Sequence, residues 1–189
     1  YGFKTTQDTF SKTVIIDPVP TRIWGSYFGG NGDEFGWLKP DRFDNIFLHG
    51  YTSSTNNVAT SGSHQPTIMG GYDAFINKIS KDGQKLWGTY YGGNYSDASG
   101  GLDFDNNDNI FVVADISIPN PMYPGNTYYY FAQLAILKFK PDGTLVFEKI
   151  FGGKSKDISY DLRYYNNNIY IIGETYSDDL ATPGAFQNS

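Results

Sequence analysis

The acidic stretch from Asp103 to Asn109 has the composition of a calcium-binding loop. Its carboxylates are at Asp103, Asp105 and Asp108, and calcium prefers hard oxygen ligands at alternating positions. An EF-hand loop also needs a glycine at its sixth position and a glutamate at its twelfth, where this chain has Asp108 and Ala114. The stretch therefore predicts an Asx-rich hairpin turn, with a calcium site at the three aspartates as the alternative.

Three further aspartates recur along the chain, each a few residues after a Gly-Gly pair. The pairs are Gly29-Gly30, Gly92-Gly93 and Gly152-Gly153, and the acids are Asp33, Asp97 and Asp157. Each carboxylate can accept backbone N–H groups in the turn that begins a new unit, or it can be one ligand of a repeated cation site. Because every unit has this acid, the structural role in the turn is the favoured interpretation.

The aromatic stretch from Ile116 to Gln133 is the most individual part of the chain. It contains the tyrosines Tyr123, Tyr128, Tyr129 and Tyr130. Aromatic side chains exposed on a loop can stack on sugar rings or anchor a protein partner. They can equally pack the loop onto the sheet that carries it. The four tyrosines are therefore predicted ligand-binding residues, with packing as the alternative.

Catalytic chemistry has little support in the sequence. The chain has no cysteine, which removes disulfides, cysteine-ligated zinc and thiol nucleophiles. Its two histidines, His49 and His64, are expected on a strand and in a loop, and neither has a serine and an aspartate arranged as in a catalytic triad. Phosphate-binding glycine loops and nucleophile-elbow motifs are absent from the sequence. The residues favour a non-catalytic protein.

An internal repeat of about 60 residues positions these side chains. The segment 23–30, IWGSYFGG, recurs at 86–93 as LWGTYYGG and more weakly at 146–153. A second element recurs at 45–48, 109–112 and 168–171, a third at 73–79 and 133–139, and Asp-Gly follows at 82–83 and 142–143. The constant order of these elements identifies true repeats, because chance similarity would not preserve it.

Each repeat predicts four short strands joined by polar turns. The predicted strands are 36–39, 45–51, 74–80 and 85–91 in the first unit and 100–104, 109–115, 134–140 and 145–151 in the second. Alternation supports this interpretation, since Phe75 and Asn77 would share one face of a strand and Ala74 and Ile76 the other. Asp-Gly between the third and fourth strands is a strong hairpin signal.

The predicted fold class is all-β, with β-propeller-like repeats and four antiparallel strands per blade. The expected boundaries are a terminal strand or linker at 1–20, a first blade at 21–93, a second at 94–153 and part of a third at 154–189. A closed propeller needs at least four blades, and this chain accounts for about two and a half. Closure is therefore expected to need the rest of a longer chain or another molecule. A β-sandwich and an open β-solenoid are the alternative architectures.

The amino-acid composition suits a β-sheet protein and argues against two classes of partner. Phe, Trp and Tyr make up 17% of the 189 residues and 22 residues are glycine, which suits short strands joined by tight turns. Charged residues are only 18% and the net charge is −6, which argues against nucleic acid or an anionic membrane surface as a partner. No apolar run has the length of a membrane-spanning helix.

The repeat resembles the SBBP β-propeller repeat. The resemblance rests on WGTYYGG and the acid that follows it at 87–97, on NIFV at 109–112 and on DAFINKI at 73–79, and it covers about 15–189. Because this family is frequent in large secreted or surface-attached bacterial proteins, the resemblance implies a secreted or cell-surface location. It also implies that residues 1–20 form the last strand of a preceding β-rich domain.

The predicted function is a non-catalytic extracellular β-propeller module that acts as a scaffold or as a binding or adhesion surface for a protein or a glycan. The expected partners are the rest of a longer chain, a neighbouring surface or secretion protein, or a glycan. Calcium is the one cofactor for which the sequence offers a candidate site. The alternative function is a carbohydrate-active enzyme domain with its site near the propeller axis.

Overall fold

The structure, a computed structural model, describes residues 23–119 and 130–187. Within these ranges the chain forms ten β-strands and no helix. The first sheet has the order β1-β2-β3-β4 and the second β5-β6-β7-β8, while β9 and β10 form a third, two-stranded sheet. All paired strands are antiparallel. The predicted all-β class and four-stranded antiparallel units are confirmed.

The strands follow the repeat along the chain. The first sheet consists of β1 (Glu34–Pro40), β2 (Ile46–Thr52), β3 (Asp73–Ile79) and β4 (Lys85–Tyr91). The second consists of β5 (Ala98–Phe104), β6 (Ile110–Pro119), β7 (Tyr130–Phe139) and β8 (Leu145–Phe151). The third consists of β9 (Asp157–Tyr165) and β10 (Asn168–Thr175).

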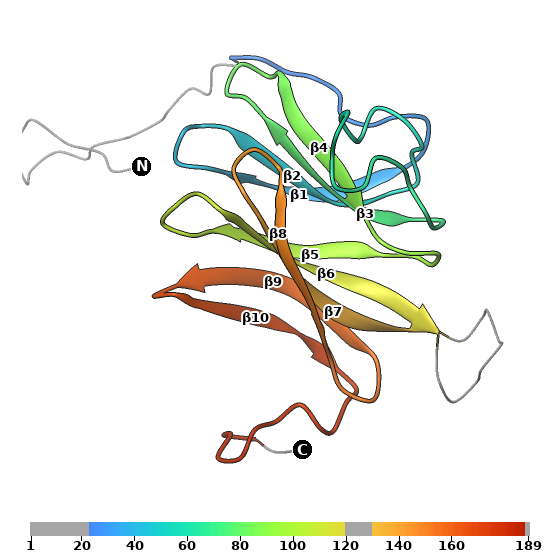
Figure 1. Cartoon of the computed structure of the whole chain (residues 1–189), viewed down its shortest axis with the longest axis vertical. Coiled ribbons are helices and arrows are strands. Elements are labelled where there is room, and N and C mark those ends of the chain that lie inside the picture. Colours follow the sequence, from blue (N-terminus) through green and yellow to red (C-terminus); the bar gives the residue numbers. More distant parts are fainter. Residues whose placement is uncertain (1–22, 120–129, 188–189) are drawn as a thin grey trace, which may run out of the picture.

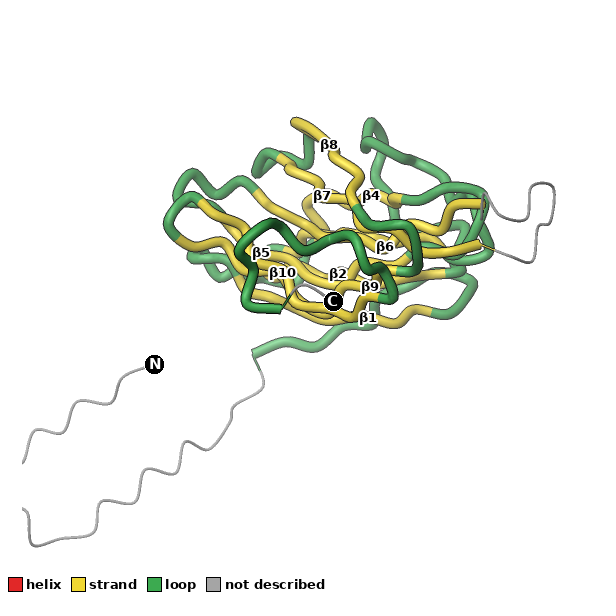
Figure 2. Tube along the Cα trace, turned by 90° about the horizontal axis from the view of Figure 1, so that it is seen from below, coloured by secondary structure: helices red, strands yellow, loops and turns green. Residues whose placement is uncertain are grey.

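The three sheets stack on one another (Figure 1). One apolar cluster joins the first sheet to the second and includes Phe47 and Ile76 on one side and Val112 on the other. Another joins the second sheet to the third, around Phe111 and Leu162. Figure 2 shows β1 and β9 along one side of the stack and β4 and β8 along the opposite side. The described residues do not close into a ring of sheets.

Alternation along β3 divides its side chains between two clusters, as the sequence predicts. Ala74 and Ile76 belong to the cluster between the first and second sheets. Phe75 belongs to a separate cluster with Val58 and Tyr90, on the other face of the first sheet. Successive side chains of a strand point to opposite faces, so an apolar strand of this kind has to be covered on both sides.

The aromatic stretch 116–133 contains a shorter loop than the sequence predicts, which corrects one expectation. β6 continues to Pro119 and β7 begins at Tyr130, and these two residues pair in the antiparallel register. Ile116 is buried between the first and second sheets, and Ile118 packs against the same cluster. Pro119 does not shorten β6 because it is the last residue of the strand, where a missing N–H costs little.

The Asx-rich turns after β1 and β5 have the same hydrogen bonds. Asp105 Oδ1 accepts the backbone N–H groups of Asn107 and Asn109, each at 2.9 Å. Asp41 makes the equivalent pair of bonds after β1. Asp108 has a φ of 62°, a left-handed conformation that Asp and Asn tolerate better than most residues. The aspartate and asparagine pattern therefore encodes the turn directly.

A tryptophan from one unit covers the hairpin turn of the next. Trp87 Nε1 donates to the carbonyl oxygen of Pro141 at 3.0 Å, and the indole ring lies against Gly143. Trp24 lies in the same way against Gly83, one unit earlier. Both glycines have positive φ, +88° for Gly143 and +83° for Gly83. Glycine is needed here because the backbone is left-handed and because the ring leaves little room.

We predict that Gly143→Ala destabilises the chain by about 2–4 kcal/mol, because the new methyl group lies in a left-handed residue and meets Trp87 Cδ2 at 2.7 Å. Gly62→Ala is the matched control. Gly62 also has positive φ, +76°, but nothing lies within 4 Å of an added Cβ, so the loss should be only about 1–2 kcal/mol. Urea unfolding measures both, and equal losses would contradict the importance of the tryptophan contact.

Candidate functional site

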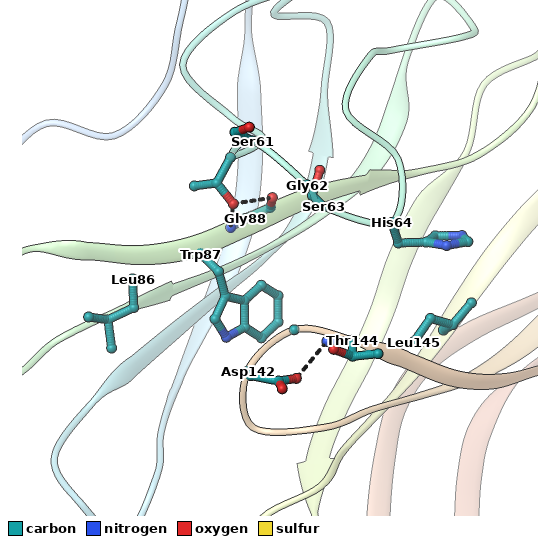
Figure 3. Close-up of a pocket in the computed structure, with 12 residues that line it drawn as sticks. Ser61, Gly62, Ser63, His64, Leu86, Trp87, Gly88, Asp142, Thr144 and Leu145 are labelled. Atoms are coloured by element: carbon teal, nitrogen blue, oxygen red, sulfur yellow. Dashed lines mark hydrogen bonds between the residues drawn. The ribbon is translucent and has the colours of Figure 1, made fainter.

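A polar cleft of about 490 Å³ lies between the first and second sheets (Figure 3). Three segments line it: residues 60–64 from the loop after β2, residues 86–88 of β4, and residues 142–145 at the β7–β8 turn. Figure 3 shows the Trp87 ring between β4 and the turn that carries Asp142 and Thr144. The cleft therefore depends on the same tryptophan that joins the two units.

Backbone hydrogen bonds fix the loop that forms one wall of the cleft. Thr60 donates its N–H to the Gly88 carbonyl oxygen at 2.9 Å, and Gly88 donates its N–H to Thr60 Oγ1 at 3.2 Å. Tyr90 donates its N–H to the Gln65 carbonyl oxygen at 3.1 Å. These bonds satisfy groups along the outer edge of β4 that would otherwise be open to pairing with another strand. The loop that forms this wall is therefore held in place by its hydrogen bonds to the first sheet.

Two polar side chains of the cleft differ in how fully they are bonded. Asp142 Oδ1 accepts the backbone N–H of Thr144 at 2.9 Å, and this bond holds the pKa of the carboxyl below its usual range. Ser63 Oγ is buried and has no hydrogen-bond partner among the described residues. Because the Ser63 oxygen is buried, it is closed to a ligand in the cleft, whereas the exposed carboxylate of Asp142 is open to one.

A second hollow, of about 260 Å³, shares His64 with the cleft. The His64 ring stacks with Tyr91 at a centroid distance of 6.2 Å and meets Phe139 edge-on at 6.4 Å. Tyr91 and Asp97 also line this hollow. Burial raises the pKa of Tyr91, and it raises the pKa of Asp97 to about 6. The hollow thus places an acid that titrates near neutral pH next to the polar cleft.

The carboxylate of Asp97, like that of Asp157, binds the Gly-Gly turn that precedes it. Gly93 donates its N–H to Asp97 Oδ2 at 2.6 Å, and Gly153 donates to Asp157 Oδ2 at 2.8 Å. The other oxygen of Asp97 accepts the N–H of Ser117, at the end of β6, at 2.7 Å. Each carboxylate therefore fixes the Gly-Gly turn, which connects two sheets, to the first strand of the second of these sheets.

In the first unit Glu34 makes these bonds instead of the predicted Asp33. Gly30 donates its N–H to Glu34 Oε1 at 3.2 Å, and Thr52 Oγ1 donates to the same oxygen at 3.1 Å. Asp33 is exposed. The acid has to come four residues after the second glycine, as Asp97 does, and Asp33 comes only three residues after it.

The first glycine of each pair makes room for the same carboxylate. An added Cβ would lie 2.2 Å from a carboxylate oxygen at Gly29, 2.5 Å at Gly92 and 3.0 Å at Gly152. Distances this short force the carboxylate or the turn to move. The Gly-Gly pair thus has two separate functions: space at the first position and an N–H donor at the second.

The three aspartates of the candidate calcium site have different partners. Asp103 pairs with Lys39 at 2.6 Å and Asp108 with Arg42 at 2.6 Å, both between the first and second sheets. Asp105 pairs with a lysine of its own sheet at 3.1 Å. No group of three metal-ligating side chains occurs in the described part of the chain. The three carboxylates are therefore held in ion pairs, two of which join the first sheet to the second.

His49 lies at the interface between the first two sheets. Its side chain is 5% exposed, and Nδ1 lies 3.0 Å from Ser99 Oγ. Burial, together with the nearby charge of Lys39, lowers its pKa to about 4. The ring is therefore neutral at pH 7, and it occupies a strand position that Val113 fills in the second unit. Packing accounts for His49 without a catalytic role.

Only one of the four predicted ligand-binding tyrosines lies among the described residues. Tyr123, Tyr128 and Tyr129 lie outside the described residues, and Tyr130 is the first residue of β7. The cleft around Trp87 was not predicted from the sequence. Its one sequence signal is the recurrence of tryptophan 63 residues apart, at 24 and 87, together with the Asp-Gly turns.

The sequence has no match among protein-family models or curated proteins. The described residues include no helix long and apolar enough to cross a membrane.

We predict that calcium leaves the thermal stability unchanged. The carboxylates at 103, 105 and 108 already have cationic partners, so calcium would have to displace them. The melting temperature in excess calcium should equal that in excess EDTA. A calcium-dependent rise in melting temperature that disappears in Asp105→Asn would contradict this expectation and support the calcium site.

We predict that His49→Val makes the chain more resistant to acid. The folded pKa is about 4, whereas the unfolded histidine titrates near 6.5, so the stability carried by the neutral ring is lost as the pH falls through this range. The advantage of His49→Val over the natural chain in free energy of unfolding should grow by about 1–2 kcal/mol between pH 7 and pH 5.

Asn77→Leu is the matched control for this experiment. Asn77 is also fully buried, does not ionise, and has Leu137 as its counterpart in the second unit. Its effect on unfolding should be the same at both pH values. An effect of His49→Val that is independent of pH would show that the histidine titrates normally in the folded chain.

Proposed function

We propose that the stacked sheets are blades of a β-propeller, and that the chain is a non-catalytic module that binds a glycan in the cleft around Trp87. The repeated interface supports the propeller arrangement. Phe47 on β2 and Phe111 on β6 occupy the same place in their units, and each packs in the cluster that joins its sheet to the next. Identical stacking from unit to unit is how blades build a continuous core.

The gathering of hydroxyl groups and one carboxylate in a cleft that Trp87 also lines is the observation that carries the glycan proposal. Sugars present hydroxyl groups beside apolar C–H faces, so they suit sites that combine polar groups with an aromatic surface. Thr60, Ser61 and Thr144 add hydroxyl groups to the lining, and Asp142 adds a carboxylate. A fixed wall of backbone-bonded loop lowers the entropy cost of binding.

Asp142 provides the one carboxyl group among the described residues that line the cleft. In the neighbouring hollow, both oxygens of Asp97 already accept backbone N–H groups. A glycosidase needs two carboxyl groups on either side of the scissile bond. Binding without turnover is therefore the favoured function, and a carbohydrate-active enzyme domain with its site near the propeller axis is the alternative.

The proposed location is extracellular, secreted or on a bacterial cell surface, and it rests on the resemblance of the repeat to SBBP repeats. We also propose the aromatic stretch as a contact surface for a partner, with Tyr123, Tyr128, Tyr129 and Tyr130 as its candidate residues. The proposed macromolecular partners are the rest of a longer chain and a neighbouring surface or secretion protein.

A glycan array followed by calorimetry tests the proposal. Ser61→Ala and Asp142→Asn should each weaken binding of the selected glycan by about tenfold, since the first removes an exposed hydroxyl group of the lining and the second a charged hydrogen-bond acceptor. Ser26→Ala is the control, because Ser26 is exposed and lies outside the cleft. Release of reducing sugar by the natural chain would establish the enzyme alternative, and unchanged binding in both cleft variants would exclude this cleft as the site.

A further inference from the structure

The face of the first sheet that points away from the second sheet is apolar and open. Leu38, Ile46, Leu48 and Ile79 from three of its strands line a hollow of about 640 Å³ beside Trp24. Leu38 is 66% exposed. In Figure 1 this face lies at the top of the stack, on the side opposite β9 and β10.

The counterparts of these residues in the second sheet are buried. They lie 64 positions later on the first two strands and 60 positions later on the third, and they are Leu102, Ile110, Val112 and Phe139. Each is at most 1% exposed, in the cluster that joins the second sheet to the first. The open face therefore presents the same kind of surface that the second sheet buries against a preceding sheet.

Part of a preceding sheet is already on this face. Residues 23–28, the counterpart of β4, cross it without a sheet of their own (Figure 1). Trp24 Nε1 donates to the carbonyl oxygen of Lys81 at 2.7 Å, as Trp87 does to the next turn, and Phe28 packs on Phe75 at a ring distance of 5.1 Å. Yet Trp24 is 38% exposed and Trp87 only 8%.

The difference in exposure has a structural cause. Trp87 is covered with the help of Phe47, Ala74 and Ile76, which the second and third strands of its own sheet contribute to the interface. The counterparts of these three side chains are missing beside Trp24, because residues 23–28 pair with no other strand in the described part of the chain. The hollow of about 640 Å³ is the space that such side chains would fill.

We propose that this face binds a three-stranded antiparallel unit of the same repeat, and that residues 23–28 complete that unit as its fourth strand. The partner unit would carry an aromatic residue in the place of Phe47, a small one in the place of Ala74 and an aliphatic one in the place of Ile76. Its third strand would pair with residues 23–28 by strand addition. The inference rests on the proposed propeller arrangement of the sheets and does not depend on glycan binding.

The third sheet of a second copy fits this face less well. β9 and β10 provide Tyr170 in the place of Phe47, but they provide no third strand to pair with residues 23–28. Arg163 also occupies the place of Lys39 in the repeat, so it would meet Lys39 of the other copy. In the existing interface Lys39 meets Asp103 at 2.6 Å. Like charges at this point disfavour self-association.

Extending the chain by its own repeat tests the proposal. A copy of residues 31–85 inserted between Arg22 and Ile23 would supply three strands, and residues 23–28 would follow them as β4 follows β3. We expect the melting temperature to rise. With Trp37→Phe in every unit, acrylamide quenching of the remaining tryptophan fluorescence should fall to roughly a third, since Trp24 would change from 38% exposed to the 8% of Trp87 while Trp87 itself stays unchanged. Unchanged quenching and melting temperature would overturn the proposal.

Two variants separate docking from a simple effect of extra chain. Leu38→Asp should leave the natural chain unaffected, because this side chain is 66% exposed, but it should abolish the gain in the extended chain. Phe47→Asp in the inserted copy alone should do the same. A gain that survives both changes would contradict the proposal. Self-association of the natural chain that is lost in Tyr170→Ser would assign the face to a second copy and also overturn it.

Discussion

Packing of apolar faces between successive sheets is the constraint on which the rest of the structure depends. On β6, Ile110 and Val112 face the first sheet, while Phe111 and Val113 belong to the cluster shared with the third. Exposing apolar side chains to water is unfavourable, so a strand that is apolar on both faces has to pack against protein on both. The second sheet is therefore stable only between two neighbours, and the same demand reappears at the open face of the first sheet.

Polar groups join the sheets at points that apolar packing alone would leave undefined. The carboxylates of Asp97 and Asp157 accept N–H groups from the Gly-Gly turns between sheets, and Trp87 bonds to the hairpin turn of the following sheet. Directional bonds of this kind set the register of one sheet on the next.

The two surfaces with proposed roles differ in chemistry because they lie at different places in the repeat. The cleft is lined by a loop and a turn, where side chains are free to vary without loss of the core. The open face of the first sheet consists of strand positions that are buried in the second unit, so its side chains are apolar like those of the core. A polar ligand suits the first surface, and another repeat unit suits the second.

The amino-acid sequence by itself determined the features that depend on near neighbours in the chain. Alternation along 73–79 and the Asx turn at Asp105 follow from local backbone chemistry, and the repeat places the strands of both four-stranded sheets. The sequence could not assign Glu34 in place of Asp33, because that role depends on which carboxylate reaches the N–H of Gly30. The tertiary structure alone decided the extension of β6 to Pro119 and the cleft around Trp87, since both arise from contacts between segments brought together only when the sheets stack.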